Sequence, residues 1–390
     1  MQQKYESLFE AFTFPSGVTV NNRVFMAPMT TWSAFENGMI TNDELAYYEK
    51  RAGGVGAVIT ACAYVSREGK AFPGGFSGSS DTTISSFKKL AKTIQNKGSK
   101  AILQIFHGGR MVPPETIGGQ TPVSASAIRA LRDEAVTPRE MTEEEIENVV
   151  NGFGETTRRA IEAGFDGVEI HGANTYLIQQ FFSPHSNRRT DKWGGTLEKR
   201  MRFPLAVVQS VLQAVRNHAK NPFLVGYRIS PEEFEEPGII FEETLQLLDI
   251  LTEEKLDYIH VSVGMLWRGS IRNKEETKPL LERIQEHVGH KIPVMGVGSI
   301  SHPDEAVEAL DKKIPLVALG RELIVEPDWV QKVRSGKEET IRQSMSLDDQ
   351  EQLVIPDAMW ETITSVPGWL PIQENQKDEN GNEPWLKANN

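Results

Sequence analysis

The stretch DGVEIHGANTYLIQQFFSPHSNRRTDKWGG, residues 166–195, indicates the fold class around which the rest of the chain is interpreted. It begins with a short apolar run, residues 168–170, between Gly167 and Gly172, which predicts a buried strand that ends in a turn. Helical patterns flank this strand at residues 142–163 and 197–218. A buried strand between two helices is a building unit of α/β proteins.

The same alternation of strand and helix runs through most of the chain. Strands are predicted at residues 23–29, 56–65, 100–106, 167–170, 223–229, 258–263, 293–297 and 316–319. Helical patterns follow most of them, at residues 42–52, 84–97, 142–163, 197–218, 241–253, 278–288, 303–310 and 327–335. Apolar strands that lead into helices indicate a parallel sheet covered by helices, and eight such units predict an α/β fold of the (β/α)8 TIM-barrel type.

The remaining segments are assigned around one barrel domain, residues 1–343. Residues 8–22 alternate apolar and polar side chains around a Pro-Ser-Gly turn, which predicts a hairpin that plugs the barrel floor. Residues 108–140 are too long for a plain connection and are expected to cross the active face. The polar residues 344–390 are expected to form a C-terminal tail that acts as a lid, an interface arm or a partly disordered end.

Composition narrows the class of protein. The 390 residues carry 42 Lys and Arg against 54 Asp and Glu, a net charge of −12, which argues against nonspecific nucleic-acid binding and against an anionic membrane surface. Residues 1–10 lack a secretory leader pattern, and no apolar run reaches membrane-spanning length, so we expect a cytoplasmic protein. Cys62 is the single cysteine and is interpreted as a core residue, which excludes a disulfide framework and a cysteine-ligated cluster.

Three polar residues follow the strand at 167–170. His171 and Asn174 could together donate hydrogen bonds to one carbonyl or phenolate oxygen, and Tyr176 could deliver a proton beside them. Each residue alone also fits a structural role: a strand cap, a turn and a core edge. Their grouping after one strand of a predicted barrel, where active sites lie, favours a catalytic site.

Two further loops predict a phosphate site. Gly296 and Gly298 lie at the end of the seventh strand, and Gly320 and Arg321 follow the eighth, which is the recurrent phosphate position of these barrels. Glycines admit the phosphate to backbone amides, and arginine can bind two of its oxygens. The structural alternative is that the glycines only turn the chain and Arg321 pairs with a nearby acid.

Gln104 on the third strand and Arg228 on the fifth are costly to bury without partners. They could form an internal polar cluster. A flat heterocycle with several carbonyl and ring-nitrogen acceptors would also satisfy both side chains while its phosphate lies at Arg321.

Six segments carry a resemblance to one family. They are APMT at 27–30, LQIFHGGR at 103–110, residues 169–195, VGYRIS at 225–230, VMGVGSI at 294–300 and LGREL at 319–323. In this order, across residues 9–333, the chain resembles the Old Yellow Enzyme family of FMN-dependent oxidoreductases. Thr30 stands where some bacterial members carry Cys, and Asn174 where some carry a second His.

The resemblance implies noncovalent FMN at the top of the barrel and NAD(P)H as electron donor. The residues it implies at the flavin ring are Pro28, Met29, Thr30, Ala61, Gln104 and Arg228. At the phosphate it implies Gly298, Ser299, Gly320 and Arg321. His171 and Asn174 would bind the carbonyl of a small activated alkene, and Tyr176 would donate the proton.

Alternatives stay open at this level. The same barrel could reduce nitro compounds or carry out oxidative demethylation. Two alternatives belong to other functional classes. One is a flavin-free lyase or aldolase that acts on a phosphorylated sugar, and the other is a flavoprotein that binds FMN without turnover. The choice between NADH and NADPH is open, and so is a homo-oligomer.

Overall fold

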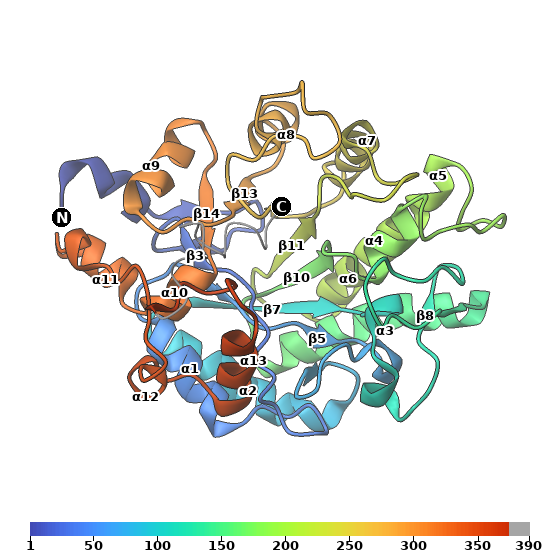
Figure 1. Ribbon diagram of the computed structural model, residues 1–390, viewed down its shortest axis with the longest axis horizontal. Coiled ribbons are helices and arrows are strands. Elements are labelled where there is room, and N and C mark those ends of the chain that lie inside the picture. Colours follow the sequence, from blue (N-terminus) through green and yellow to red (C-terminus); the bar gives the residue numbers. More distant parts are fainter. Residues whose placement is uncertain (374–390) are drawn as a thin grey trace.

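The computed structural model describes residues 1–373, in which eight parallel strands close into a barrel (Figure 1). Around the barrel the strands are β3 (Val24–Met26), β4 (Ala57–Ile59), β7 (Lys100–Phe106), β10 (Gly167–Gly172), β11 (Leu224–Ile229), β12 (Tyr258–Ser262), β13 (Val294–Val297) and β14 (Leu316–Leu319). The pairing of β7 with β10 and of β14 with β3 closes the ring. The predicted TIM barrel is therefore confirmed.

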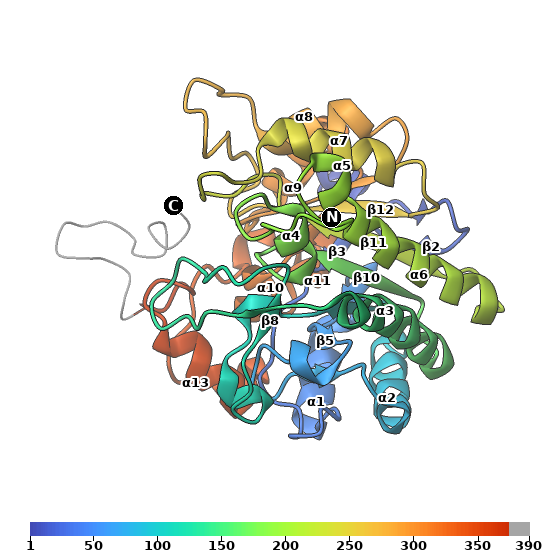
Figure 2. The same ribbon diagram turned by 90° about the vertical axis from the view of Figure 1, so that its right-hand side faces the viewer.

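Helices cover the outside of the ring, and the apolar faces of strands and helices meet in one large core. They are α1 (Asn42–Ala52), α2 (Ile84–Gln95), α3 (Glu143–Ala163), α4 (Leu177–Phe182), α5 (Leu197–Arg200), α6 (Arg202–His218), α7 (Phe241–Leu251), α8 (Leu280–Val288), α9 (Pro303–Asp311), α10 (Arg321–Val325) and α11 (Trp329–Arg334). The side-chain oxygen of Thr142 accepts from Glu145 N–H, and the Glu145 carboxylate accepts from Thr142 N–H, so a capping box starts α3. Figure 2 shows α3 and α6 packed side by side.

Two predicted elements are divided in the structure. The strand expected at 56–65 ends at Ile59, and a short β5 (Ala63–Tyr64) follows that pairs with β7 and with β6 (Phe76–Ser77). The helix expected at 197–218 is interrupted between α5 and α6. Pro204 lies in the first turn of α6 and has no N–H for the carbonyl of Arg200, which accounts for the interruption.

The amino-terminal hairpin closes the barrel floor. Strands β1 (Phe12–Thr13) and β2 (Thr19–Val20) pair antiparallel around the predicted turn. Phe14 lies beside the inward-facing rings of Phe25 and Tyr258, with centroids 6.2 and 5.9 Å away. These aromatic contacts fill the lower end of the barrel.

Two additional segments lie outside the repeating pattern. Residues 108–140 contain β8 (Val123–Ser124), which pairs with β9 (Arg139–Glu140). After the last barrel helix come α12 (Gln350–Leu353) and α13 (Asp357–Ser365), and a β-bridge joins Met345 to Ile372. Residues 374–390 of the expected tail lie outside the described residues, and the domain boundary at residue 343 stays a prediction.

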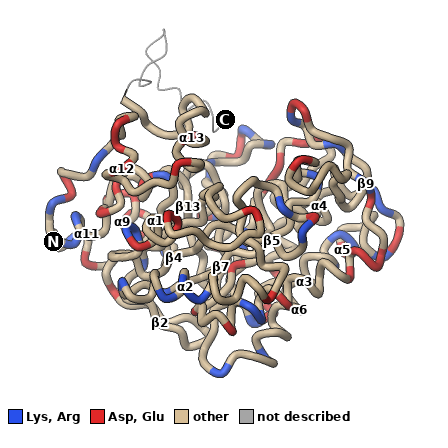
Figure 3. Tube along the Cα trace, turned by 90° about the horizontal axis from the view of Figure 1, so that it is seen from below, with Lys and Arg blue, Asp and Glu red and all other residues tan. Residues whose placement is uncertain are grey.

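Charged residues of both signs are scattered along the trace in Figure 3. None of the helices within residues 1–373 combines the length and apolar character needed to cross a membrane.

Candidate active site

His171 lies at the carboxyl end of β10 and is almost fully buried. Its Nδ1 accepts a hydrogen bond from the Ala173 N–H at 3.3 Å, so the ring proton belongs on Nε2. Burial lowers the pKa of His171 well below its usual range, and the positive charge of Arg228 lowers it further. His171 is therefore a neutral donor through Nε2–H.

Asn174 follows in a left-handed backbone conformation, with φ of 55°, and Thr175 repeats it with φ of 63°. Such residues are strained and need support from their surroundings. The Asn174 N–H donates to Ser230 Oγ at 2.9 Å, and the Thr175 N–H donates to Gln179 Oε1 at 2.9 Å. The Ser262 hydroxyl donates to Asn174 Oδ1 at 2.9 Å, which leaves Nδ2 as the donor that Asn174 offers to a ligand.

Tyr176 is the residue immediately before α4, at the helix N-cap. Its ring lies edge-on to His171, with centroids 5.0 Å apart, and 5.2 Å from the ring of Phe106. Burial raises the pKa of Tyr176, so the phenol keeps its proton at neutral pH. The structure thus places His171 and Tyr176 in contact, and Asn174 lies between them in the sequence.

Cys62 is buried, as expected for a core residue, but it lies between β4 and β5 in a small cluster that packs against Tyr176. Burial raises the pKa of its thiol to about 12. Cys62 is therefore an uncharged residue packed next to Tyr176, a location that the sequence did not indicate.

A polar layer crosses the barrel interior below this group. Glu169 on β10 accepts from Gln104 Nε2 at 2.8 Å, from the Tyr258 hydroxyl at 3.0 Å and from His260 Nδ1 at 2.9 Å. Burial alone would raise the pKa of Glu169, but His260, Arg228 and Gln104 more than offset it, so the net direction is down. Glu169 is ionised, and burial keeps His260 neutral by lowering its pKa.

Arg228 lies between His171 and His260 in the strand register. It is 8% exposed, and its buried Nε has no hydrogen-bond partner within residues 1–373. Glu169 interacts with it through space. A buried guanidinium with an unused N–H is the feature expected where an electron-rich ligand completes the site.

The side of the site formed by β3 and β4 is less polar. Pro28 is buried, whereas Met29 and Thr30 are partly exposed just after β3. The Ala61 N–H donates a hydrogen bond to the Tyr48 hydroxyl oxygen at 2.7 Å, and the Ala61 carbonyl accepts one from Thr60 Oγ1. Ala61 can therefore contact a ring mainly by packing.

The predicted phosphate loops meet at the other end of the site. Gly298 has φ of 143°, and a side chain there would collide with the backbone of Met265 and Leu266, at 2.7 Å. Arg321 donates to Ser299 Oγ at 2.6 Å, and Gly320 precedes α10. Within residues 1–373 no carboxylate forms an ion pair with Arg321, so the alternative of a simple internal ion pair is not observed.

A cavity of about 100 Å³ opens between Arg321, Ser299 and Trp369. Glu322 also lines this cavity, but burial and the nearby Glu326 and Glu305 raise its pKa to about 9. At neutral pH Glu322 is thus protonated and adds no charge that would repel a phosphate.

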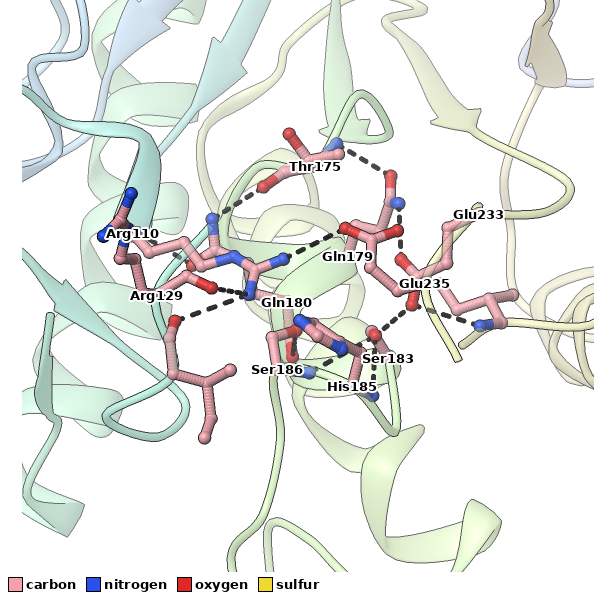
Figure 4. Close-up of polar contacts among 12 residues, drawn as sticks. Arg110, Arg129, Thr175, Gln179, Gln180, Ser183, His185, Ser186, Glu233 and Glu235 are labelled. Atoms are coloured by element: carbon pink, nitrogen blue, oxygen red, sulfur yellow. Dashed lines mark hydrogen bonds and ion pairs between the residues drawn. The ribbon is translucent and has the colours of Figure 1, made fainter. Parts of the chain in front are cut away.

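A second cavity, of about 460 Å³, opens beside Asn174 and Ser262. The loop after β11 supplies its acidic wall, which we define as Glu232, Glu233 and Glu235, and Arg268 is the cationic side chain among the lining residues. Figure 4 shows how this loop is anchored. Glu233 accepts from Gln179 Nε2 at 3.0 Å and from the Ser183 hydroxyl, while Arg110 reaches Glu235 at 3.5 Å.

These features fit FMN, which the resemblance implies. Arg228 and Gln104 offer polar groups to the ring, and Arg321 with the backbone at Gly298 and Gly320 offers a cradle for the phosphate. A purely structural polar cluster does not explain why the buried Nε of Arg228 has no hydrogen-bond partner within residues 1–373.

Comparison with known proteins gives the same assignment. The model of the NADH:flavin oxidoreductase / NADH oxidase family matches residues 7–340. A probable NADH-dependent flavin oxidoreductase, YqiG, of Bacillus subtilis is 48% identical over 96% of this chain and 100% of its own length. The NADH:acrylate oxidoreductase of Vibrio harveyi is 49% identical over 91% of this chain, but the match spans only 36% of that longer protein.

Among solved structures, morphinone reductase in complex with tetrahydroNAD superposes with a TM-score of 0.75 at 25% identity, over 95% of this chain and 99% of the other. The family match covers most of the chain, and its members use FMN with a reduced nicotinamide dinucleotide. A flavin-free sugar-phosphate lyase and a flavoprotein without turnover are thereby set aside. The chain belongs to the NADH:flavin oxidoreductase / NADH oxidase family, the family of the Old Yellow Enzyme homologues, and is an FMN-dependent NAD(P)H oxidoreductase.

Proposed function

We propose that this protein reduces the C=C bond of α,β-unsaturated carbonyl compounds with electrons from NADH. The observation that carries the proposal is the pair of fixed donors, His171 Nε2–H and Asn174 Nδ2–H. Each has its acceptor atom already occupied, by the Ala173 N–H and by the Ser262 hydroxyl. We propose that these two neutral donors bind the same carbonyl oxygen, which gains negative charge during reaction.

In this proposal FMN, when bound, supplies the hydride chemistry, taking two electrons from the nicotinamide and giving them to the substrate. Pro28, Met29, Thr30, Ala61, Gln104 and Arg228 would hold its ring, and Gly298, Ser299, Gly320 and Arg321 its phosphate. The positive charge of Arg228 would stabilise electron density on the ring.

His171 and Asn174 would grip the substrate oxygen and draw charge from the β-carbon, which receives the hydride. A well-placed donor of this kind typically contributes ~3–4 kcal/mol to transition-state stabilisation. Tyr176 would donate its proton to the α-carbon and regain one from solvent, so that the π bond is replaced by two C–H bonds.

The acidic wall supports NADH over NADPH. Glu232 accepts hydrogen bonds from the Ser270 hydroxyl and the Ile271 N–H, and it interacts with the charge of Arg268, so that one cationic side chain faces the three carboxyl groups of the wall. A donor whose nicotinamide lies over Asn174 must extend its phosphates along this opening. The additional 2′-phosphate of NADPH would then meet unfavourable charge. The names of YqiG and of the Vibrio harveyi relative likewise specify NADH.

Absorption spectroscopy of the purified protein under anaerobic conditions tests the proposal. We expect flavin bands that bleach with NADH and recover on addition of cyclohexenone. Bleaching followed by recovery with a nitroarene but with no enone would instead favour the nitroreductase alternative. Recovery with neither would contradict C=C reduction.

The acrylate activity of the longer relative does not transfer directly to this barrel. The chain spans little more than a third of that protein. A carboxylate substrate at Asn174 would also face Glu232 and Glu235 across the same cavity. We therefore propose neutral enones and enals as substrates, rather than unsaturated acids.

A further inference from the structure

Glu169 is a buried charge to which neither the proposed chemistry nor the family comparison assigns a role. It lies on β10 two residues before His171, and its side chain is fully buried. Removing a carboxylate from water is expensive unless hydrogen bonds replace the lost hydration. Glu169 has these bonds from Gln104, Tyr258 and His260, on two other strands.

The bond to Gln104 has a directional consequence. An ionised carboxylate can only accept hydrogen bonds, so Gln104 must turn its amino group, Nε2, towards Glu169. The carbonyl oxygen Oε1 is then the atom that Gln104 presents away from the carboxylate. Without the charge of Glu169, both orientations of the amide would be available.

The ring of oxidised FMN carries several acceptors and a single N–H donor, at the N3 imide. With one Nε2–H directed at Glu169, Gln104 has its carbonyl oxygen turned outwards to accept from that donor. We propose that Glu169 is a positioning residue that fixes the Gln104 amide, so that its oxygen accepts from the N3–H of the flavin. The inference rests on the proposed placement of FMN at Gln104.

The neighbours of Glu169 sharpen the expected effect of a substitution. Tyr258 and His260 both donate to Oε2, whereas Gln104 donates to Oε1. In Glu169→Gln the new amide would keep its oxygen towards Tyr258 and His260. Its amino group would then face Gln104, which would have to reverse and turn its own amino group towards the flavin.

Competition between two flavins measures this reversal. The holoenzyme is equilibrated with mixtures of FMN and 3-methyl-FMN, which has no N3–H, and the bound flavin is identified by mass after gel filtration. We expect the full-length protein to prefer FMN by at least tenfold. Glu169→Gln should reduce that preference to threefold or less, whereas Tyr258→Phe, which removes one bond to Glu169 but leaves Gln104 held, should keep it.

A second pair of variants tests the route through Gln104. Gln104→Ala should have a reduced preference, and adding Glu169→Gln to it should change nothing further. An unchanged preference in Glu169→Gln would overturn the inference. So would a loss of preference that persists when Gln104 is already absent, because the effect would then not pass through the amide.

One measurement needs no folded variant at position 169. In NMR of the full-length protein loaded with ¹⁵N-labelled FMN, a hydrogen-bonded N3–H should give a downfield, slowly exchanging proton that is lost in Gln104→Ala. Retention of that proton in Gln104→Ala would contradict the inference. A protein that binds neither flavin would instead contradict the proposed function itself.

Discussion

The inner and outer parts of the candidate site are built in different ways. The inner part consists of strand residues such as Gln104 and Glu169, whose neighbours are set by register and whose polar atoms are closely matched. The outer part is the acidic wall, which lies on a loop and borders Phe234, a side chain that is 68% exposed. The difference suggests that the strands specify the cofactor and its chemistry, whereas the loop selects which small molecules approach.

The largest effect should come from Tyr176, which joins the two parts. Tyr176→Phe removes the proposed proton donor but keeps the ring that packs on His171 and Phe106. We expect enone reduction to slow by about 10²- to 10³-fold, since general-acid catalysis contributes that order of magnitude. Stopped-flow rates of the two half-reactions check it. Equal loss in flavin reduction by NADH would assign Tyr176 to the donor step instead.

Ser262 tests whether the orientation of a donor matters as much as its presence. Ser262→Ala frees Asn174 Oδ1, so the amide is no longer fixed with Nδ2 towards the substrate. Because one hydrogen bond is lost, we expect transition-state stabilisation to fall by about 1 kcal/mol, which lowers kcat/KM for cyclohexenone roughly fivefold. Ser262→Thr retains the hydroxyl and should restore the rate. If both variants behave alike, the hydroxyl does not orient Asn174.

The acidic wall should have a smaller effect, confined to the choice of electron donor. Replacing Glu232 and Glu235 together by Gln should narrow the NADH over NADPH preference about two- to fourfold, as expected for solvent-screened charges several ångströms from a phosphate. Glu236→Gln is the matched control, because Glu236 lies on the same loop and is mostly exposed but is not among the residues that line the cavity. An equal change in the control would assign the preference to overall charge.

The smallest effect concerns pH. The pKa of His171 is lowered, chiefly by burial, and that of Tyr176 is raised by burial. Because His171 becomes charged only well below pH 6.5 and Tyr176 loses its proton only above pH 10, kcat/KM for cyclohexenone should vary less than twofold between pH 6.5 and 8. A fall towards pH 6.5 with a slope of one proton would mean that His171 is more basic than its surroundings imply.

The sequence predicted the barrel well because its strands are nearly continuous apolar runs, which only a parallel sheet covered on both faces accommodates. His171, Asn174 and Tyr176 were found because they follow a strand directly. Glu169 was overlooked, since it was counted within an apolar run at 168–170. A charged residue in a buried strand was itself the available signal. Its pairing with Gln104 depends on strand register across the barrel, which a single sequence does not give.

Other parts of the site could not be anticipated for a different physical reason. The support that Gln179 gives to Thr175, and that Glu233 gives to Gln179, links a short helix to a loop more than fifty residues away. No periodicity or motif reports such a contact. The placement of Trp369 beside Arg321 likewise depends on how residues after the barrel fold back over it.

That fold-back has a consequence for the biogenesis of the protein. Residues 345–372 return to the barrel through the bridge between Met345 and Ile372, and they bring Trp369 over the end that holds Ser299 and Arg321. Chains fold largely from the amino terminus as they leave the ribosome. The eight strands can therefore assemble while this cover is still being synthesised. The end of the barrel at Ser299 and Arg321 is therefore the last part of the candidate site to be completed, after the strands that form it.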